Sequence, residues 1–174
     1  MDWTIRPALP SDAQNLSELA ERTFRDAFSA LNTPEDMDLH CATAYTPALQ
    51  SAEIADPDVL TLVAESRGAL VAYAQLRLHS ATPACVDISP AIELQRIYVD
   101  QGFHGKGLAV ELLAEVFWRA EQHGAAALWL GVWEHNPRAI RFYQRHGFVE
   151  VGDHVFVVGS DPQRDLLMVR RCSL

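Results

Sequence analysis

Long hydrophobic runs are missing from this chain of 174 residues, and no apolar segment reaches the roughly 18 residues that a membrane-spanning helix needs. Residues 1–4 (MDWT) have neither the basic segment nor the apolar stretch of a secretory signal. Cysteine is also scarce: Cys41, Cys85 and Cys172 lie far apart, with no C-x-x-C pair. We therefore expect a cytoplasmic protein with reduced thiols and no membrane partner.

Basic charge is in short supply, and lysine is nearly absent. The chain has 14 basic and 23 acidic residues, a formal net charge of −9, and Lys106 is its only lysine. A general nucleic-acid binder needs a basic face to neutralise phosphates, so that class is excluded. The seven histidines show no H-x₃-H or H-E-x-x-H spacing, so we expect no metal site.

The composition that remains is that of an ordinary globular protein, with 49% apolar and 21% charged residues. A chain of this length buries about 70% of its unfolded surface, so we expect residues 1–174 to form a single domain. Its acidic charge is concentrated in residues 1–87, with 13 acids and 5 bases. Residues 88–174 have 10 acids and 9 bases, and so tolerate an anionic ligand better.

Apolar spacing and turn residues predict an α/β fold with a mixed central sheet of about seven strands and four or five helices. We expect strands over residues 4–7, 59–65, 69–79, 93–99, 127–133, 148–158 and 166–171, and helices beginning near residues 11, 33, 46, 108 and 136. Residues 127–133 are almost continuously apolar, which is typical of a parallel strand covered on both faces.

A glycine-rich loop, His104-Gly105-Lys106-Gly107-Leu108-Ala109, joins a predicted strand to a predicted helix. Free backbone N–H groups at a helix N-terminus attract anions, and glycine lets the backbone approach a ligand closely. A P-loop motif is absent, and a dinucleotide fingerprint has Val110 at its third glycine position. A glycine turn that serves only tight packing is the alternative.

Three further motifs lie in order along the chain: Ile5-Arg6-Pro7-Ala8 near the start, Glu93 to Val99 before the loop, and Asn136-Pro137-Arg138-Ala139 followed by Phe142-Tyr143 and Gly147-Phe148. Together with the loop, they resemble the GNAT superfamily of acetyl-CoA-dependent N-acetyltransferases over nearly the whole chain. The family loop pattern is Q/R-x-x-G-x-G/A, which Gly107 and Ala109 match and His104 does not.

The resemblance implies a GNAT fold in which the fourth and fifth strands are parallel and splay apart, with acetyl-CoA as co-substrate and no metal. The loop amides would hold the pyrophosphate, and the pantetheine arm would pair with the fourth strand. The implied cofactor-binding residues are Ile97, Tyr98, Val99, His104, Gly105, Lys106, Gly107, Leu108, Ala109, Asn136, Arg138, Ala139, Phe142 and Tyr143.

Two residues are candidates for proton transfer. The phenol of Tyr143, with a reference pKa of about 10, is protonated at neutral pH and suits a general acid that protonates the departing thiolate. Glu93 is the candidate base that takes a proton from the amine, directly or through water, with Glu134 and His135 as rivals. The structural alternatives are that Tyr143 merely packs against the sheet and that Glu93 is a solvated carboxylate.

The acceptor is predicted from charge. Glu35, Asp36 and Asp38 cluster at the start of one short helix, and residues 24–36 resemble a bacterial branch that includes polyamine N-acetyltransferases. We therefore expect a small-molecule amine, a cationic one such as a polyamine first and a protein lysine or N-terminus second, attacked directly in a ternary complex. The alternatives are acids that only stabilise a helix N-terminus, a non-catalytic acyl-CoA-binding regulatory module, and a structural domain. The sequence leaves a homodimer open.

Overall fold

The computed structural model describes residues 2–172. The strands are β1 (Thr4–Pro7), β2 (Val59–Ser66), β3 (Ala69–Arg77), β4 (Ala91–Val99), β5 (Ala127–Trp133), β6 (Val149–Val158) and β7 (Asp161–Arg171). The helices are α1 (Ala13–Phe28), α2 (Pro34–Ala44), α3 (Pro47–Ala55), α4 (Leu108–Gln122) and α5 (Pro137–Arg145), with short 3₁₀ turns at Pro10–Asp12, Ser29–Leu31 and Gln101–Phe103.

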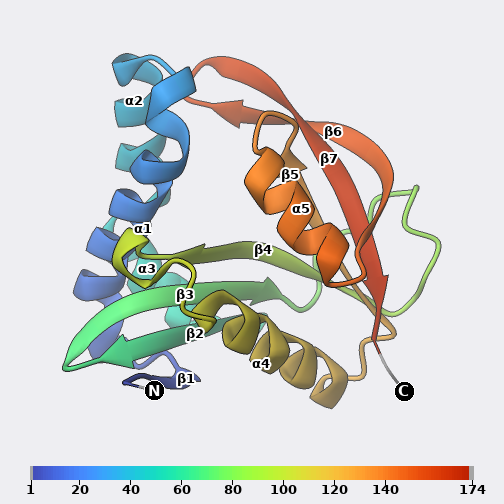
Figure 1. The fold of residues 1–174 in the computed structure, drawn as a ribbon, viewed down its shortest axis with the longest axis horizontal. Helices are drawn as coiled ribbons and strands as arrows, with labels where there is room; N and C mark the ends of the chain where they lie inside the picture. The colour runs from blue at the N-terminus through green and yellow to red at the C-terminus, as the bar shows by residue number, and fades with distance from the viewer. Residues whose placement is uncertain (1, 173–174) are drawn as a thin grey trace.

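All seven strands form one mixed sheet in the order β1-β2-β3-β4-β5-β7-β6 (Figure 1). Neighbouring strands are antiparallel except β4 and β5, which are parallel. The predicted α/β fold with a mixed sheet of about seven strands is confirmed. No helix within residues 2–172 is long and apolar enough to cross a membrane.

Each face of the sheet has its own hydrophobic core. On one face, Leu108, Leu112 and Val116 of α4 pack with α5 against β2–β5. On the other, Leu16, Leu19 and Phe24 of α1 pack with α2 and the partly buried Ile54 of α3. Adjacent residues of β2 join different cores, as the alternation of side chains along a strand requires. The buried sheet is thus a rigid support for groups placed at strand ends.

The divergence of β4 from β5 creates the central feature of the fold. The two strands pair only over Ala91–Glu93 and Ala127–Trp129, after which β4 continues along β3 and β5 continues along β7. A β-bulge at Gln95, where Arg96 and Leu94 pair with consecutive residues of β3, bends β4 at this point. The predicted splay is present, and it begins directly after Glu93.

The β6–β7 turn folds over the N-terminal helices. Gly159 in this turn has φ +62°, and a Cβ built there would lie 2.5 Å from the Cα of Asp36 in α2. Only glycine permits so close an approach at this backbone angle. The Asp36 carboxylate accepts hydrogen bonds from the backbone N–H and the hydroxyl of Ser160, at 2.7 and 2.9 Å. The hairpin is therefore fixed to α2.

The last strand begins earlier than predicted. β7 starts at Asp161 rather than at residue 166, so Pro162 lies inside the strand, opposite Val157 of β6. Pairing of β7 with β5 begins only at Asp165. Because Pro162 has a strand neighbour on one side only, its missing N–H interrupts no ladder there. The proline was therefore a misleading signal for a turn.

Candidate active site

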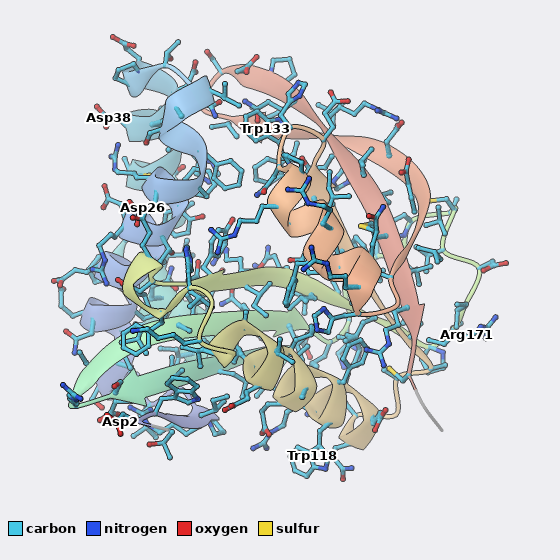
Figure 2. The ribbon with its side chains drawn as sticks, viewed as in Figure 1. Asp2, Asp26, Asp38, Trp118, Trp133 and Arg171 are labelled. Atoms are coloured by element: carbon cyan, nitrogen blue, oxygen red, sulfur yellow. The ribbon has the colours of Figure 1, made fainter. Side chains whose placement is uncertain are left out.

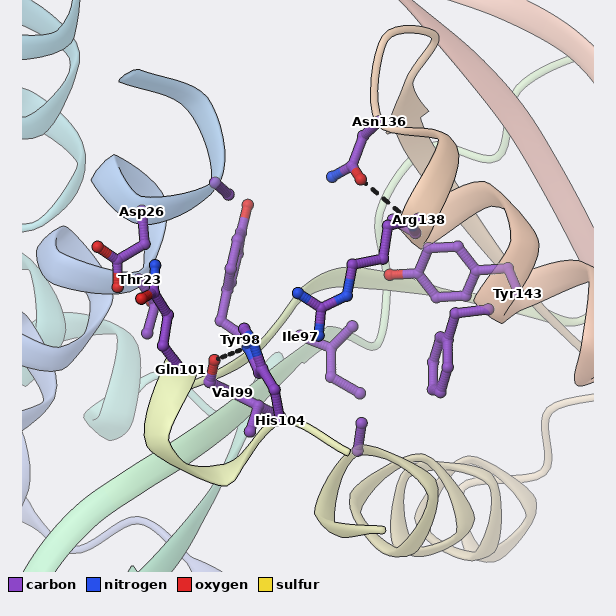
Figure 3. A pocket seen from close by; sticks show the side chains of 14 residues that line it. Thr23, Asp26, Ile97, Tyr98, Val99, Gln101, His104, Asn136, Arg138 and Tyr143 are labelled. Carbon is purple, nitrogen blue, oxygen red and sulfur yellow. Dashed lines mark hydrogen bonds between the residues drawn. The ribbon is translucent and has the colours of Figure 1, made fainter. Parts of the chain in front are cut away.

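A cavity of about 530 Å³ opens where β4 leaves β5, a volume within the usual range of small-molecule sites. α1, the end of β4, the glycine loop and α5 enclose it (Figure 3). We call it the cofactor pocket. Its lining includes Thr23, Asp26, Ala27 and Gln101, together with Ile97, Tyr98, Val99, His104, Ala109, Asn136, Arg138, Ala139, Phe142 and Tyr143. The last ten were all predicted from the sequence.

The remaining four predicted residues, Gly105, Lys106, Gly107 and Leu108, form the loop between His104 and Ala109. Gly105 and Gly107 have φ of +74° and +91°, and a Cβ at either would meet nothing within 4 Å. Within residues 2–172, the backbone N–H groups of residues 105–109 donate no hydrogen bond. The loop thus presents unpaired amides at the N-terminus of α4, an arrangement that fits a phosphate.

The side chains of Lys106 and Leu108 do not line the cofactor pocket. The Lys106 ammonium lies 5.2 Å from the centre of the Phe103 ring, and Leu108 is fully buried in the core. A different basic residue lines the pocket. In Figure 3 the guanidinium of Arg138, at the start of α5, points into the middle of the cofactor pocket.

His104, which replaces the usual glutamine or arginine of the family pattern, is engaged within the protein. Its Nε2 lies 2.8 Å from the carbonyl oxygen of Val99, and because a carbonyl only accepts, Nε2–H is the donor. That nitrogen therefore holds the loop against the end of β4. With Nε2 carrying the hydrogen, Nδ1 of the neutral ring is an acceptor, so the neutral His104 side chain has no donor left for a phosphate.

β4 directs backbone groups into the gap. The N–H of Asp100 bonds the carbonyl of Val71 on the β3 side, at 2.9 Å. Because successive residues of a strand alternate the direction of their N–H and C=O groups, those of Val99 and Ile97 point away from β3. Only the Val99 carbonyl is already taken, by His104. An extended polar chain can therefore pair with this free strand edge.

Asn136 and Tyr143 face β4 across the gap. The side-chain oxygen of Asn136 caps α5 by accepting the N–H of Ala139 at 3.0 Å, which leaves its NH₂ group for a ligand. The Tyr143 hydroxyl points toward the interior of the pocket in Figure 3. Burial raises the pKa of Tyr143 above its usual value, so the phenol keeps its proton throughout the neutral range.

A second, smaller cavity of about 170 Å³ lies on the other side of the same gap, and we call it the acceptor slot. Tyr98, Asn136 and Tyr143 border both cavities. Aromatic side chains form a large part of its wall, among them Phe24, Phe28, Tyr45, Trp133 and Phe156. Its polar members include His40, Gln95, Arg96, Gln163 and Asp165, of which the sequence analysis had singled out none for this role.

The structure does not bring the candidate bases to either cavity. Glu93 lies in the paired part of β4, opposite Arg77 and Trp129, and is half-buried outside both linings. Glu134 accepts a hydrogen bond from Arg164 at 3.0 Å, and the His135 side chain is 65% exposed. The expectation that Glu93 reaches the acceptor side directly is therefore corrected, because the strands diverge only after it.

The acidic cluster lies at the start of a short helix, α2, as predicted, but outside both cavities. Asp36 binds Ser160, and Asp38 pairs with Arg25 of α1 at 2.9 Å while its side chain faces solvent (Figure 2). Glu35 is exposed, and none of the three lines the acceptor slot. Asp38 attaches α2 to α1, and Asp36 attaches it to the β6–β7 turn.

Comparison with known proteins identifies the class that this fold and site define. The chain superposes on the PaiA N-acetyltransferase from Thermoplasma acidophilum, solved in complex with coenzyme A, with a TM-score of 0.80 at 20% identity over 98% of this chain and 99% of that one. At this identity the likeness concerns the fold.

The family follows from the sequence comparisons. Residues 14–148 match the model of the acetyltransferase (GNAT) family, and the chain belongs to that family. An uncharacterized N-acetyltransferase of Lactobacillus delbrueckii subsp. lactis is 32% identical over 157 residues, 90% of each protein. The spermine/spermidine N(1)-acetyltransferase of Bacillus subtilis is 38% identical over 56 residues only, 32% of this chain and 37% of that protein.

The protein is thus an acyltransferase enzyme of the GNAT type, and the open loop amides and free β4 edge fit an acyl-CoA. Among residues 2–172, no three His, Cys, Asp or Glu side chains lie together as a group that could hold a metal ion.

Proposed function

We propose that the enzyme transfers acetyl from acetyl-CoA to a small cationic amine by direct attack of the amine on the thioester. The observation that carries this proposal is that two cavities meet at the divergence of β4 and β5, with Tyr143 and Asn136 on the border of both. A thioester reaching the border from one side and an amine from the other come together without an intermediate on the protein.

We assign the cofactor pocket to acetyl-CoA because of the hydrogen-bond donors and the positive charge around it. The amides of residues 105–109 would hold the pyrophosphate, Arg138 would add positive charge, and the backbone of Ile97 and Val99 would pair with the pantetheine arm. Acetyl-CoA supplies the activated acetyl group. Each of these protein groups lies on or beside the cofactor pocket.

Direct attack forms a C–N bond and breaks the C–S bond, so two N–H protons of the acceptor ammonium must leave. The first goes to a base or water before attack, since an amine of pKa about 10.4 is neutral at pH 7 in about one molecule of 2,500. The second is balanced by the proton that Tyr143 gives to the leaving sulfur. From its position in β4, Glu93 takes part only through a relay of water molecules.

The placement of the cysteines supports direct transfer over an acyl-enzyme. None of the three lines either cavity, and burial raises the pKa of both Cys41 and Cys172 to about 11. A thiol with so high a pKa is almost entirely protonated at neutral pH and is a poor nucleophile.

A cationic acceptor is favoured by the balance of −8 in residues 1–87, which supply α1 and α2, and by the aromatic wall of the acceptor slot. Aromatic faces attract ammonium groups, and an acidic surface draws cations at a rate that salt reduces. The partial similarity to a spermine/spermidine N(1)-acetyltransferase points the same way.

We expect spermidine to give a higher kcat/KM than neutral or anionic amines, and this advantage to shrink as salt is raised, because screening weakens the attraction. Thiol release from acetyl-CoA, followed with a panel of amines and a lysine peptide at two salt concentrations, measures it. An anionic amino acid as the best substrate, or spermidine turnover indifferent to salt, would contradict the charge argument while leaving acetyl transfer intact.

A further inference from the structure

One carboxylate in the acceptor slot has no hydrogen-bond partner among the described residues. Asp165 of β7 is 9% exposed, and its side-chain oxygens accept no hydrogen bond from the described residues. The Nε2 of His154 lies 3.9 Å from its Oδ2, beyond hydrogen-bond distance, and forms an ion pair with it only when His154 is protonated. The Asp165 side chain is 12% exposed, so its charge is largely withdrawn from water but not sealed from it, and a partner of opposite charge would stabilise it. Asp165 therefore resembles half of an ion pair whose other half is a ligand.

The other charges near the slot are already neutralised within the protein. The Arg96 guanidinium binds Glu53 at 3.0 Å and Gln75 at 2.8 Å, and Glu53 also binds Arg77. His40 is stacked on Phe24 with ring centres 4.4 Å apart, and burial together with Arg96 lowers its pKa. Asp165 is thus the one carboxylate that lines the slot.

The absence of a side chain at Gly131 keeps the space beside this carboxylate uncrowded. Gly131 of β5 lines the slot, and a Cβ built there would lie 3.0 Å from the Nε2 of His154 and 3.2 Å from the Oδ2 of Asp165. Any larger residue at this position would crowd the carboxylate. The aromatic wall continues above it, with Trp133 at the end of β5 (Figure 2) next to Phe28, their ring centres 5.5 Å apart.

We propose that Asp165 is the anchor for the acceptor's ammonium group, held over Gly131 within the aromatic wall, and that the acceptor is a primary alkylammonium. A cation there gains a charge-assisted hydrogen bond from the carboxylate and cation–π attraction from the rings. The apolar arm of such an amine matches the wall. Asp165 is therefore a specificity-determining residue, an assignment that rests on the proposed amine acetylation.

Titration gives a second signature of this anchor. Burial raises the pKa of Asp165 to about 6, with His154 opposing the rise. The anchor therefore gains its charge between about pH 5 and 7, and affinity for a cation should increase over that range. The other titratable or charged groups that line the slot are His40 from α2, Tyr45 at the end of α2, Arg96 and Tyr98 from β4, and Tyr143 from α5. Loss of positive charge from His40 would also increase the affinity for a cation as the pH rises. The contribution of the carboxylate is therefore the difference between the pH profiles of the wild type and an Asp165 variant.

The test is calorimetry of spermidine binding to the protein saturated with coenzyme A, which requires no turnover. Asp165→Asn should weaken binding by roughly 10–100-fold, as expected for a lost charged hydrogen bond, and should flatten the rise in affinity between pH 5 and 7. Glu35→Gln, which removes the same charge from an exposed position outside the slot, is the matched control and should bind like the wild type. Unfolding in urea should show Asp165→Asn to be at least as stable as the wild type, because it removes an unpaired buried charge.

Gly131→Ala keeps every charge and tests the same site if the first variant does not fold. It should weaken spermidine binding severalfold by displacing the carboxylate. The anchor would be overturned if folded Asp165→Asn bound spermidine with wild-type affinity. It would also be overturned if the wild type did not bind spermidine at all. If spermidine bound in a manner that depended on Asp165 but no acetyl were transferred to it, the proposed function would be contradicted and the anchor would stand.

Discussion

Replacing Gly107 with glutamate is expected to abolish acetyl-CoA binding. Gly107 is the N-cap of α4, with φ +91° and open space where a side chain would begin. A glutamate would place bulk and negative charge in the space that the unpaired amides offer to phosphate, and would add strain of about 1–2 kcal/mol at this backbone angle. Titration calorimetry should show no heat of binding with a folded variant.

Gly124 provides the matched control for this substitution. It follows the other end of α4 with φ +76° and an equally open environment, away from both cavities. Gly124→Glu imposes the same charge and a similar backbone strain, yet it should bind acetyl-CoA like the wild type. If folded Gly107→Glu bound acetyl-CoA with wild-type affinity, the assignment of the loop as the pyrophosphate site would be wrong.

The second large effect is expected from Tyr143→Phe, which removes one hydroxyl and keeps the ring that packs against Phe148. kcat should fall by roughly 10²–10³, the range expected for loss of a general acid, while acetyl-CoA affinity changes little. Burial raises the pKa of Tyr143, so its ionisation should not limit activity below pH 10. Burial raises the pKa of a thiol next to Tyr143 as well as that of the phenol. The difference between the two pKa values therefore changes less than either value alone.

Steady-state kinetics with saturating acetyl-CoA measures this effect, and Tyr73→Phe is its control. Tyr73 is completely buried beneath the site, its hydroxyl has no partner among the described residues, and it lines neither cavity. Removing that hydroxyl should leave kcat unchanged. An unchanged kcat in Tyr143→Phe would mean that water or another group protonates the thiolate.

Features set by local sequence were predictable. Gly105 and Gly107 both adopt positive φ in the glycine-rich loop that the sequence predicted between a strand and a helix. The alternation and length of apolar segments likewise predicted every strand, and the start of β7 was missed only because Pro162 mimics a turn. These signals depend on a few neighbouring residues, so they can be read from the sequence directly.

What escaped prediction depends on contacts between distant segments. Thr23 and Asp26 line the cofactor pocket because α1 is packed over the end of β4, and no motif marks them. Asp165 meets His40 in one slot across more than a hundred residues of chain. Glu93 was misplaced because nothing local states that β4 and β5 stay paired through it and part at the bulge of Gln95.

The central claim is acetyl transfer to an amine within one ternary complex, and initial-rate kinetics tests it most directly. Thiol release should require both acetyl-CoA and an amine, and double-reciprocal plots against one substrate at several levels of the other should intersect. Parallel lines with thiol release in the absence of amine would show an acetyl-enzyme instead. Binding of acetyl-CoA without thiol release with any amine would contradict an acetyltransferase altogether.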